Sequence, residues 1–363
     1  MSEAKTAADG AREAARPQLT LVPGGRTQPK LAVVITCFNY ETYVEAAILS
    51  VQAQGRDDVQ LVVVDDGSTD GSWAAINRTG VAAFRIANGG QRVACLHGLD
   101  QTTAPFVLFL DADDALKPSA LATIIAHLDA GVAKLQFPLT RIDGAGLPIG
   151  GAVPALADFR TREALATRVL RTGAYATPPT SGNVFRRDVC ELLREADYDR
   201  AVDGVILFAA PFFGDVVSLS QELGLYRIHG LNDSGLGRPA DAAALDRDIR
   251  RFVQRTAHLR RFLDRIGRAG DLVPTDAMFF VLERRFSLAI ASGRRPPLAG
   301  LPRLLARLWQ DDHPPRTRAT MTAFFLLAAL LPNGRARRVM AFRFDVGRRS
   351  ARDLLRAIFG AER

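Results

Sequence analysis

From Leu31 onward, short apolar runs rich in β-branched residues alternate with longer segments of helical spacing. The runs LAVVITC (31–37), QLVVVD (60–65), VAAFRI (81–86) and PFVLFL (105–110) predict buried strands bounded by polar turns. The intervening segments YVEAAILSVQAQ, DGSWAAINR and QRVACLHGLDQ predict helices. Strands that alternate with helices in this way predict an α/β fold, a Rossmann-like and mostly parallel sheet with helices on both faces.

The pattern changes twice further along the chain. After KLQFPL (134–139) it loosens into the turn-rich stretch IDGAGLPIGG, and a helix (161–172) and the short strands NVFRR and GLYRIH follow. Beyond Arg238 the chain is predicted to be helical and punctuated by prolines. We therefore expect three parts: a disordered tail (1–29), an α/β domain (30–238) and an Arg-rich helical region (239–363).

Composition limits the setting in which the protein works. The tail lacks the apolar core of a secretory signal, and no stretch reaches the roughly 18 to 20 apolar residues of a spanning helix, so we expect a cytoplasmic protein. Its three cysteines, Cys37, Cys95 and Cys190, fit neither a disulfide framework nor a zinc pair and are expected to be reduced and buried. Residues 239–363 hold 25 arginines, no lysine and 12 acidic residues, a balance of +13 within a chain of net charge +8.

Polar clusters come directly after the predicted strands: TCFNY, DDGSTD, NGG and DADD. In a parallel sheet all four would line one edge, where ligands of such sheets bind. A dinucleotide site of the Rossmann type is excluded, because TCFNYETY has no glycine triplet to approach a pyrophosphate.

The DADD cluster predicts a cation site. Asp111 and Asp113 are two residues apart, so in an extended segment both carboxylates point to the same side, and hard oxygens of this kind suit Mg²⁺ or Mn²⁺. Asp114 is expected instead to begin a helix that has Pro118 in its first turn. In DDGSTD, one aspartate is explained by a turn, but Asp65 and Asp66 together exceed that need and predict hydrogen bonds to a ribose or a base.

Taken together, these segments resemble the family 2 glycosyltransferases, which have the GT-A fold. The resemblance rests on ITCFNYETYVEAAILSVQAQ, LVVVDDGSTDGS, NGGQRVACLHGLDQTTAPFVLFLDADDALKPSAL, SGNVFRR and LGLYRIHGLNDSG, and it covers Leu31 to Ser234. It implies a nucleotide-diphospho-sugar donor, with a UDP-sugar as the commonest case, a divalent Mn²⁺ or Mg²⁺, and inversion at the anomeric carbon. Polysaccharide or glycoconjugate assembly on a glycan or lipid-linked acceptor is the implied setting.

The resemblance also implies roles for particular residues. Asp113 would bind the metal directly, Asp111 would lie near the ribose and the metal, and His229 would complete the metal shell or contact the diphosphate. Asp203 would be the general base that takes the acceptor proton, with a helix cap as its alternative role and Asp197, Asp199 and Asp215 as rivals. The residues that would border the donor are Thr36, Phe38, Asn39, Tyr40, Glu41, Asp65, Asp66, Asn88, Gly90, Gln91, Ser181 and Asn183.

Two alternatives remain open from the sequence. A nucleotidyltransferase shares this kind of sheet, although it typically has a basic glycine-rich loop after the first strand. A non-catalytic scaffold could use the Arg-rich helices, because the apolar segment AFFLLAALL and the basic one after it suit the interface of an anionic membrane, while a solvated helical bundle explains them equally. Nucleic acid is an unlikely partner, since no aromatic platform is interleaved with the arginines.

Overall fold

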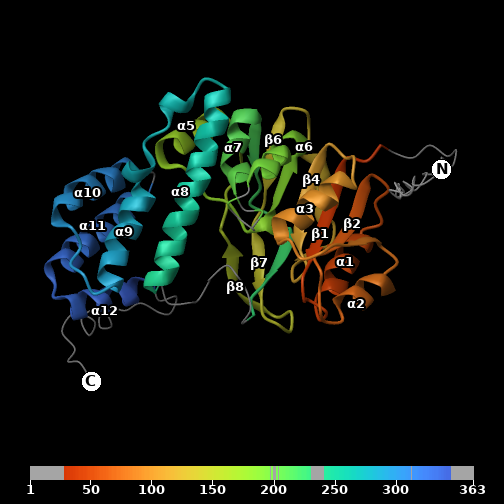
Figure 1. Cartoon of the computed structure of the whole chain (residues 1–363). Coiled ribbons are helices and arrows are strands. Elements are labelled where there is room, and N and C mark those ends of the chain that lie inside the picture. Colours follow the sequence, from red (N-terminus) through yellow and green to blue (C-terminus); the bar gives the residue numbers. More distant parts are fainter. Residues whose placement is uncertain are drawn as a thin grey trace, which may run out of the picture.

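The computed structural model describes residues 28–196, 198, 202, 204–229, 241–311 and 313–344 (Figure 1). At its centre lies an eight-stranded sheet of order β3-β2-β1-β4-β10-β6-β11-β9. The strands are β1 (Leu31–Cys37), β2 (Val59–Asp65), β3 (Ala82–Arg85), β4 (Phe106–Asp111), β6 (Val132–Gln136), β9 (Phe159–Thr161), β10 (Asn183–Arg186) and β11 (Asp215–Ser218). The sequence prediction of the first four strands is confirmed to within one residue at each end.

The sheet is mostly parallel, as predicted. Strand β1 pairs in parallel with β2 and β4, and β2 with β3, while β10 and β9 run antiparallel to their neighbours. All seven residues of β1 are buried, which explains its unbroken apolar sequence, because a central parallel strand is covered on both faces.

Helices cover both faces of the sheet, and β1 contributes alternate side chains to each. Val34 belongs to the cluster under α3, whereas Val33 and Ile35 belong to the cluster under α1. Gly98 lets α3 approach β1 closely, since a Cβ there would lie 2.3 Å from a methyl group of Val34. The helices of this domain are α1 (Val44–Gln52), α2 (Ser72–Arg78), α3 (Gln91–Asp100), α4 (Ala120–Ala126), α5 (Glu163–Thr172), α6 (Arg187–Cys190) and α7 (Val205–Phe213).

A second sheet, of order β5-β12-β7-β8, lies beside the first and comprises β5 (Ala115–Leu116), β7 (Leu139–Ile142), β8 (Pro148–Val153) and β12 (Gly224–Arg227). The stretch expected only to be turn-rich is a hairpin of β7 and β8. The carboxylate of Asp143 shapes its loop by accepting hydrogen bonds from the N–H groups of Ala145 and Leu147. Strand β8 is mostly exposed and lacks apolar alternation, so periodicity gave no signal for it.

The C-terminal helices pack against the domain through α7, where the rings of Phe213 and Phe262 stack with centroids 5.1 Å apart. They are α8 (Ala242–Arg265), α9 (Phe279–Ala291), α10 (Leu301–Gln310), α11 (Pro315–Leu330) and α12 (Asn333–Phe344), as the helical prediction required. Prolines stand at the starts of α10 and α11, where a missing N–H costs no helical bond. Within the described ranges, none of these helices combines the length and apolarity that crossing a bilayer demands.

Candidate functional site

The strand ends expected to share an edge do so. Cys37 lies opposite Asp65 and Thr36 lies opposite Asp111 in the parallel register, so β1, β2 and β4 end side by side. The polar segments that follow these strands therefore start from one line at the carboxyl edge of the sheet. This alignment is the basis of the site.

Asp111 ends β4 and is half-buried. Its Oδ1 accepts a hydrogen bond from Gln91 Nε2 at 2.5 Å, and its backbone N–H donates to Ser181 Oγ at 3.1 Å. Gln91 also accepts, through Oε1, the backbone N–H of Val202 at 3.2 Å. Asp111 and Asp113 together are called the DxD pair below. The Gln91 amide thus connects the first aspartate of this pair to the segment around residue 202.

Asp113 is paired with His229. Asp113 Oδ2 lies 2.9 Å from His229 Nε2, and both side chains are only about a tenth exposed. The backbone around Asp113 is fixed from the second sheet, because Arg227 Nε donates to the Asp113 carbonyl at 2.9 Å. The predicted association of the DxD pair with His229 therefore has a direct contact in the structure.

Asp114 does not begin a helix, contrary to the sequence prediction. Helix α4 starts at Ala120, after the short strand β5. The Asp114 side chain instead points inward, where its carboxylate accepts hydrogen bonds from Ser181 Oγ at 2.6 Å and from the backbone N–H of Arg227 at 3.0 Å. Burial, with the neighbouring Asp113 carboxylate as a second cause, raises the pKa of Asp114 well above its ordinary value.

Tyr43 is a site residue that the sequence analysis missed. Its ring stacks on His229 with centroids 5.5 Å apart, and the Arg227 guanidinium lies 4.6 Å from the centre of the same ring. Tyr40 approaches His229 edge-on, with ring centroids 5.8 Å apart. Aromatic side chains from the turn before α1 thus orient the imidazole next to Asp113.

Asp66 holds the loop in front of α3. Its two carboxylate oxygens accept the backbone N–H groups of Gly89 and Gly90, each at 2.8 Å. Gly67 has φ +76, and a Cβ there would lie 3.0 Å from the backbone nitrogen of Asn88, so this close approach needs glycine. Asp66, Asn88 and Gly90 are therefore brought together, and Asn88 is exposed at the surface of the loop.

Asp65 is the last residue of β2. Its side chain is fully buried, where Oδ1 accepts the Ser68 N–H at 3.2 Å and Oδ2 pairs with Arg85 Nε at 3.0 Å. The enclosed carboxylate fixes the turn after β2, and its side chain has no exposed surface in this structure. The contact of Asp65 with the donor stays a prediction.

The segment after β1 is tied to the start of α2. Asn39 Oδ1 accepts the Thr69 N–H at 2.8 Å, and Glu41 Oε2 accepts the Gly71 N–H at 2.7 Å. Phe38 is 44% exposed, which is unusual for a phenylalanine and leaves its ring available at the edge. Thr36, by contrast, is buried within β1.

Ser181 and Asn183 are interior residues. Asn183 is fully buried, and its Nδ2 donates to the carbonyls of Pro178 and Pro179 at 3.1 and 2.8 Å. Ser181 lies in a short 3-10 turn (Thr180–Gly182) and bridges Asp111 to Asp114 as described above. Both side chains are buried beneath the surface of the site. The structure therefore places them in supporting positions, and their direct contact with the donor stays a prediction.

Lys134 is a second residue that the sequence did not reveal. Its side chain is fully buried, and Nζ donates to Thr177 Oγ1 at 2.8 Å and to Gln136 Oε1 at 3.0 Å. Thr177 Oγ1 in turn donates to Asn183 Oδ1 at 3.0 Å. Lys134 therefore anchors the segment that carries Ser181.

The candidate base cannot be placed. Asp203 and its rivals Asp197 and Asp199 lie outside the described residues. Asp215 is described, and it stands at the start of β11, the edge opposite the site, in an ion pair with Arg160 at 2.6 Å. Asp215 is thereby ruled out as the base.

The metal prediction has partial support in the donor set. Carboxylate oxygens suit Mn²⁺ or Mg²⁺, an imidazole nitrogen is a common metal ligand, and the contact between Asp113 and His229 brings one of each together. In the part of the chain that the structure describes, no group of three or more His, Cys, Asp or Glu side chains converges as a metal site. Asp113 and His229 are thus the residues that fit the ion, while the Asp111 carboxylate is engaged by Gln91.

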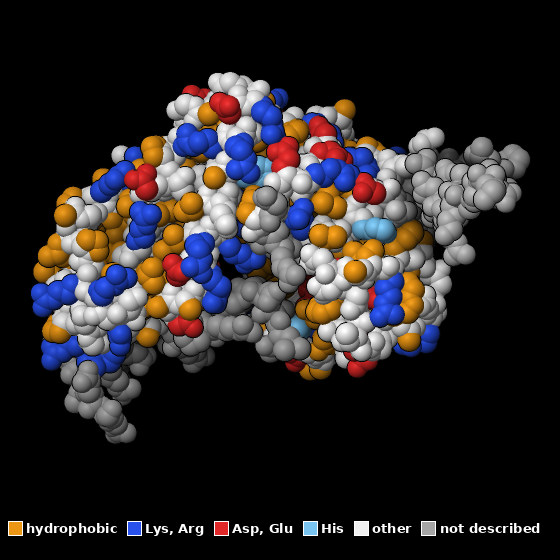
Figure 2. Space-filling view, viewed as in Figure 1, with side chains coloured by type: hydrophobic (Ala, Val, Ile, Leu, Met, Phe, Trp, Pro, Cys, Tyr) orange, Lys and Arg blue, Asp and Glu red, His pale blue; other side chains and the backbone are white. Residues whose placement is uncertain are grey.

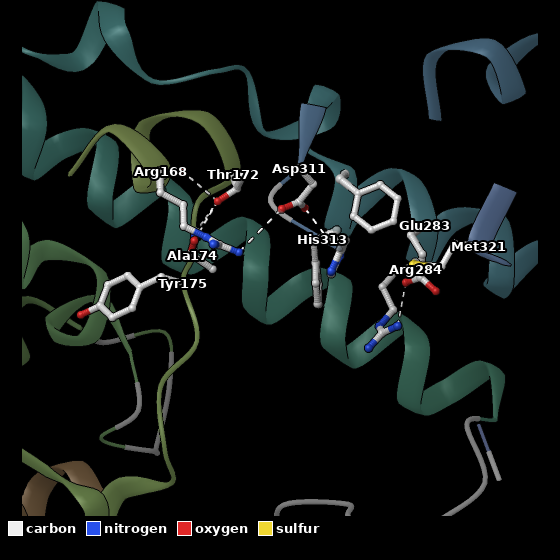
Figure 3. Close-up of a pocket in the computed structure, with 11 residues that line it drawn as sticks. Arg168, Thr172, Ala174, Tyr175, Glu283, Arg284, Asp311, His313 and Met321 are labelled. Atoms are coloured by element: carbon white, nitrogen blue, oxygen red, sulfur yellow. Dashed lines mark hydrogen bonds and ion pairs between the residues drawn. The ribbon is translucent and has the colours of Figure 1, made fainter. Parts of the chain in front are cut away.

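A separate cavity of about 410 Å³ lies where α5 meets α9 and the segment before α11 (Figure 3). Its charged side chains are paired with one another: Arg168 with Asp311 at 3.7 Å, and Arg284 with Glu283 at 2.7 Å. None of the DxD, His229 or Gln91 side chains lines it, so it is not part of the site at the sheet edge.

The three buried cysteines Cys37, Cys95 and Cys190 are free thiols, as predicted. Burial raises the pKa of the Cys37 thiol, next to the site, to about 11. It is therefore protonated at neutral pH and is no nucleophile.

Comparisons with known proteins agree with this geometry. Residues 32–174 match the model of the family described as Glycosyl transferase family 2. An uncharacterized glycosyltransferase of Nostoc sp. is 34% identical over 249 residues, which cover 66% of this chain and 77% of the relative. The GalNAc(5)-diNAcBac-PP-undecaprenol beta-1,3-glucosyltransferase of Campylobacter jejuni is 34% identical over 116 residues, 29% of this chain and 36% of that enzyme.

Solved structures give a broader and weaker likeness. TarS 1–349 of S. aureus in complex with UDP-GlcNAc aligns over 91% of this chain and 90% of its own, at 16% identity and a TM-score of 0.47. The mannosyltransferase PcManGT of Pyrobaculum calidifontis, in complex with GDP-Man and Mn²⁺, aligns over 93% and 89%, at 17% identity and a TM-score of 0.44. With a family match over the strands that build the site, and a 34% identical relative covered over most of its length, the chain belongs to glycosyltransferase family 2.

Proposed function

We propose that the protein is an inverting, metal-dependent transferase that moves a sugar from a nucleotide-diphospho-sugar to an acceptor hydroxyl. The observation that carries this proposal is the shared edge of β1, β2 and β4, which aligns Asp111 and the Asp113–His229 pair with the loops after the other strands. Family membership favours it over a nucleotidyltransferase. A UDP-sugar is the proposed donor.

The donor binds along the segments that follow the strands. Phe38 offers an exposed ring, and Tyr40 and Glu41 stand beside it at the start of α1. Asp66 fixes the Gly89–Gly90 backbone, so that the loop with Asn88 keeps its shape when the nucleotide arrives. Asp111, held by Gln91, meets the ribose side of the donor.

Asp113 and His229 are the residues that would hold a divalent cation. When bound, the cation neutralises charge on the departing nucleotide diphosphate. The protein contributes orientation: Tyr43 and Tyr40 fix the imidazole, and Arg227 fixes the backbone carbonyl of Asp113. Asp114, held by Ser181 and the Arg227 N–H, fixes the turn that carries Asp113 against the second sheet.

Asp203 is the proposed general base, because inverting transfer needs a carboxylate that takes the acceptor proton as the oxygen attacks. The support is positional: Val202, the residue before it in the chain, donates its N–H to Gln91, which binds Asp111. The proton moves from the acceptor hydroxyl to the Asp203 carboxylate. The acceptor oxygen bonds to the anomeric carbon on the face opposite the diphosphate, while the bond from that carbon to the diphosphate oxygen breaks and the nucleotide diphosphate leaves with the electron pair.

The acceptor is proposed to be a glycan or a lipid-linked glycan in polysaccharide or glycoconjugate assembly. The Campylobacter relative carries an undecaprenol-diphosphate glycan in its name, which supports a lipid-linked acceptor. A cytoplasmic location at the inner face of the membrane suits such an acceptor, and the basic C-terminal region suits anionic lipid.

A donor panel tests the proposal. The full-length protein is incubated with UDP-, GDP- and dTDP-sugars and Mn²⁺ or Mg²⁺, and the release of nucleotide diphosphate is measured. We expect release from at least one donor, its loss on chelation with EDTA, and its recovery when the ion is restored. If no donor is bound or hydrolysed under any of these conditions, the chain is a scaffold and the proposal fails.

A further inference from the structure

The outer face of α11 carries an apolar strip that the fold does not use. Arg318, Thr322, Leu326 and Leu330 follow at intervals of four residues, so they lie above one another on one side of the helix. Leu326 is 43% exposed and Leu330 is 80% exposed.

Trp309, at the end of α10, extends this face. Its Nε1–H donates to Thr322 Oγ1 at 3.0 Å, while Arg318 Nη1 donates to the Trp309 carbonyl at 2.9 Å and the Arg318 guanidinium lies 5.4 Å from the centre of the indole ring. The ring is still half exposed. Trp309, Leu326 and Leu330 are called the α11 strip below.

The helical bundle does not need the strip for its core. The opposite side of α11 supplies Phe325 and Ala328, which are fully buried in a cluster with Phe286 and Leu308. The exposed leucines therefore add apolar surface without adding to the packing. Single exposed leucines are common, but two on one line with an exposed indole are a feature to explain.

The charge around the strip is strongly positive. Residues 298–344 contain eight arginines, two aspartates and no lysine or glutamate, a balance of +6. Arg335 and Arg337 are exposed at the start of α12, five and seven residues after Leu330 in the chain, and Arg337 Nε donates to the Ile290 carbonyl at 3.3 Å. Figure 2 shows Lys and Arg side chains scattered among hydrophobic ones over the region of α9 to α12.

We propose that the α11 strip is the surface with which this protein binds an anionic bilayer. The leucine side chains enter the boundary between headgroups and acyl chains, where tryptophan side chains are also enriched in membrane proteins. The arginines contact lipid phosphates. The inference rests on the proposed location at the membrane and makes it specific to three side chains. It does not depend on the sugar chemistry at the sheet edge.

Charge favours an anionic bilayer over two other molecules that could cover the α11 strip, a second copy of the chain and residues 345–363 of the same chain. A second copy of the chain would bring an equally positive surface against the strip, which repulsion disfavours. Residues 345–363 of the same chain, which lie outside the described residues, contain five arginines and three acidic residues, so they are net positive as well. An anionic lipid surface complements the strip in both charge and polarity.

The test uses fluorescence of the full-length protein, which has only two tryptophans, Trp73 and Trp309. A Trp73→Phe variant leaves Trp309 as the sole reporter. On addition of vesicles that contain phosphatidylglycerol, we expect a blue shift of its emission and quenching by brominated acyl chains. Vesicles of phosphatidylcholine alone, or 0.5 M NaCl, should reduce the effect because screening weakens the arginine contacts.

Substitution of the strip provides the second measurement. Leu326→Gln with Leu330→Gln should lower the vesicle partition coefficient by about 30-fold, as the loss of two partly buried leucines implies. Leu49→Gln is the matched control, since Leu49 is a leucine of similar exposure, 48%, on α1. Nucleotide diphosphate release in vesicle-free buffer should be unchanged in both, which separates this inference from the proposed function.

Four outcomes would overturn the inference. The first is an unquenched Trp309 in bound protein. The second is equal partitioning of the double variant and the Leu49→Gln control. The third is binding that disappears when residues 345–363 are deleted but persists in the double variant. The fourth is a concentration-dependent dimer that the double variant abolishes, without any vesicle binding by the parent.

Discussion

At the carboxyl edge of the large sheet, carboxylates are buried and held by partners far away in sequence, whereas the arginines of α10 to α12 stand mostly in solvent beside exposed leucines. Asp113 and Asp114 are 6% and 2% exposed, and contacts to both come from Arg227 in β12, 113 or more residues further along the chain. Leu330, by contrast, is 80% exposed with arginines close to it in sequence. In the first region, tertiary hydrogen bonds fix the orientation of the carboxylates. In the second region, arginine and leucine side chains remain exposed and can contact a binding partner.

This difference has a practical consequence. Substitutions at the sheet edge should change the rate of sugar transfer or the pH dependence of stability. Substitutions on the outer faces of the C-terminal helices should change only the binding of the protein to membranes. A loss of sugar transfer from the α11 strip variants in solution, or of vesicle binding from the edge variants, would erase the distinction.

The largest effect is expected for Asp113→Ala. Removal of this carboxylate takes away the Asp113 contact of His229 and the charged group proposed to hold the cation, so nucleotide diphosphate release should fall by about 10³-fold or more. Thermal unfolding should stay close to that of the parent. Asp129→Ala, an exposed aspartate at the opposite edge, is the control and should retain full activity; similar losses in both would remove the special status of the DxD pair.

Asp203→Asn should come next. If Asp203 is the base, the turnover number for transfer should drop by about 10² to 10⁴-fold. Donor binding, measured by isothermal titration with UDP and Mn²⁺, should be unaffected. Asp215→Asn, in the ion pair with Arg160, should leave turnover unchanged; a weaker donor affinity with normal turnover would assign Asp203 to donor binding instead.

Gln91→Met should have an intermediate effect. The thioether keeps the volume but loses both the hydrogen bond to Asp111 and the one from Val202. We expect kcat/KM to fall by about tenfold, the size of one lost hydrogen bond to a charged group. Gln52→Met on α1 is the matched control; a Gln91 variant indistinguishable from it would show that the bridge has no role in catalysis.

Asp114→Asn should affect activity least, less than Asp113→Ala, and should change the pH dependence of stability. Because the folded state raises the pKa of Asp114 above its unfolded value of about 3.9, the folded protein binds this proton more tightly. The contribution is fully present below that unfolded value and is lost as the pH rises through the raised folded pKa.

The free energy of unfolding should therefore decline less with rising pH in Asp114→Asn than in the parent. Urea titrations between pH 4.5 and 8.5 measure this difference, with the exposed Asp57→Asn as the control. Parallel curves for Asp114→Asn and the parent would contradict a raised pKa.

Local sequence was sufficient for the first four strands of the large sheet and for the helices between them. The strand β1 was readable because its seven buried residues leave an unbroken apolar run, and the polar residues after β1, β2 and β4 were correctly expected to share an edge. The DxD aspartates and His229 were also identified, from a resemblance whose motifs lie in these same segments.

Local sequence carried no information about the tertiary hydrogen-bond partners of buried polar side chains. Lys134 in KLQF gave no sign that its ammonium would be enclosed, since the hydrogen bonds to Thr177 and Tyr175 that, together with the one to Gln136, make its burial tolerable come from tertiary contacts. Asp114 carries the signature of a helix start, and the contacts that override it come from Ser181 and Arg227. Asp65 and Asn183 likewise have polar side chains whose enclosure depends on tertiary contacts.

The Gln91 side chain has a kinetic consequence. Its Nε2 donates to the carboxylate of Asp111, 20 residues further along the chain. Its Oε1 accepts the backbone N–H of Val202, 111 residues further along and next to Asp203. A ligand that shifts Asp111 would thereby reset the position of Val202. The expected signature is a compulsory order of substrates, donor before acceptor, with intersecting initial-rate lines and competitive inhibition by free nucleotide diphosphate against the donor alone.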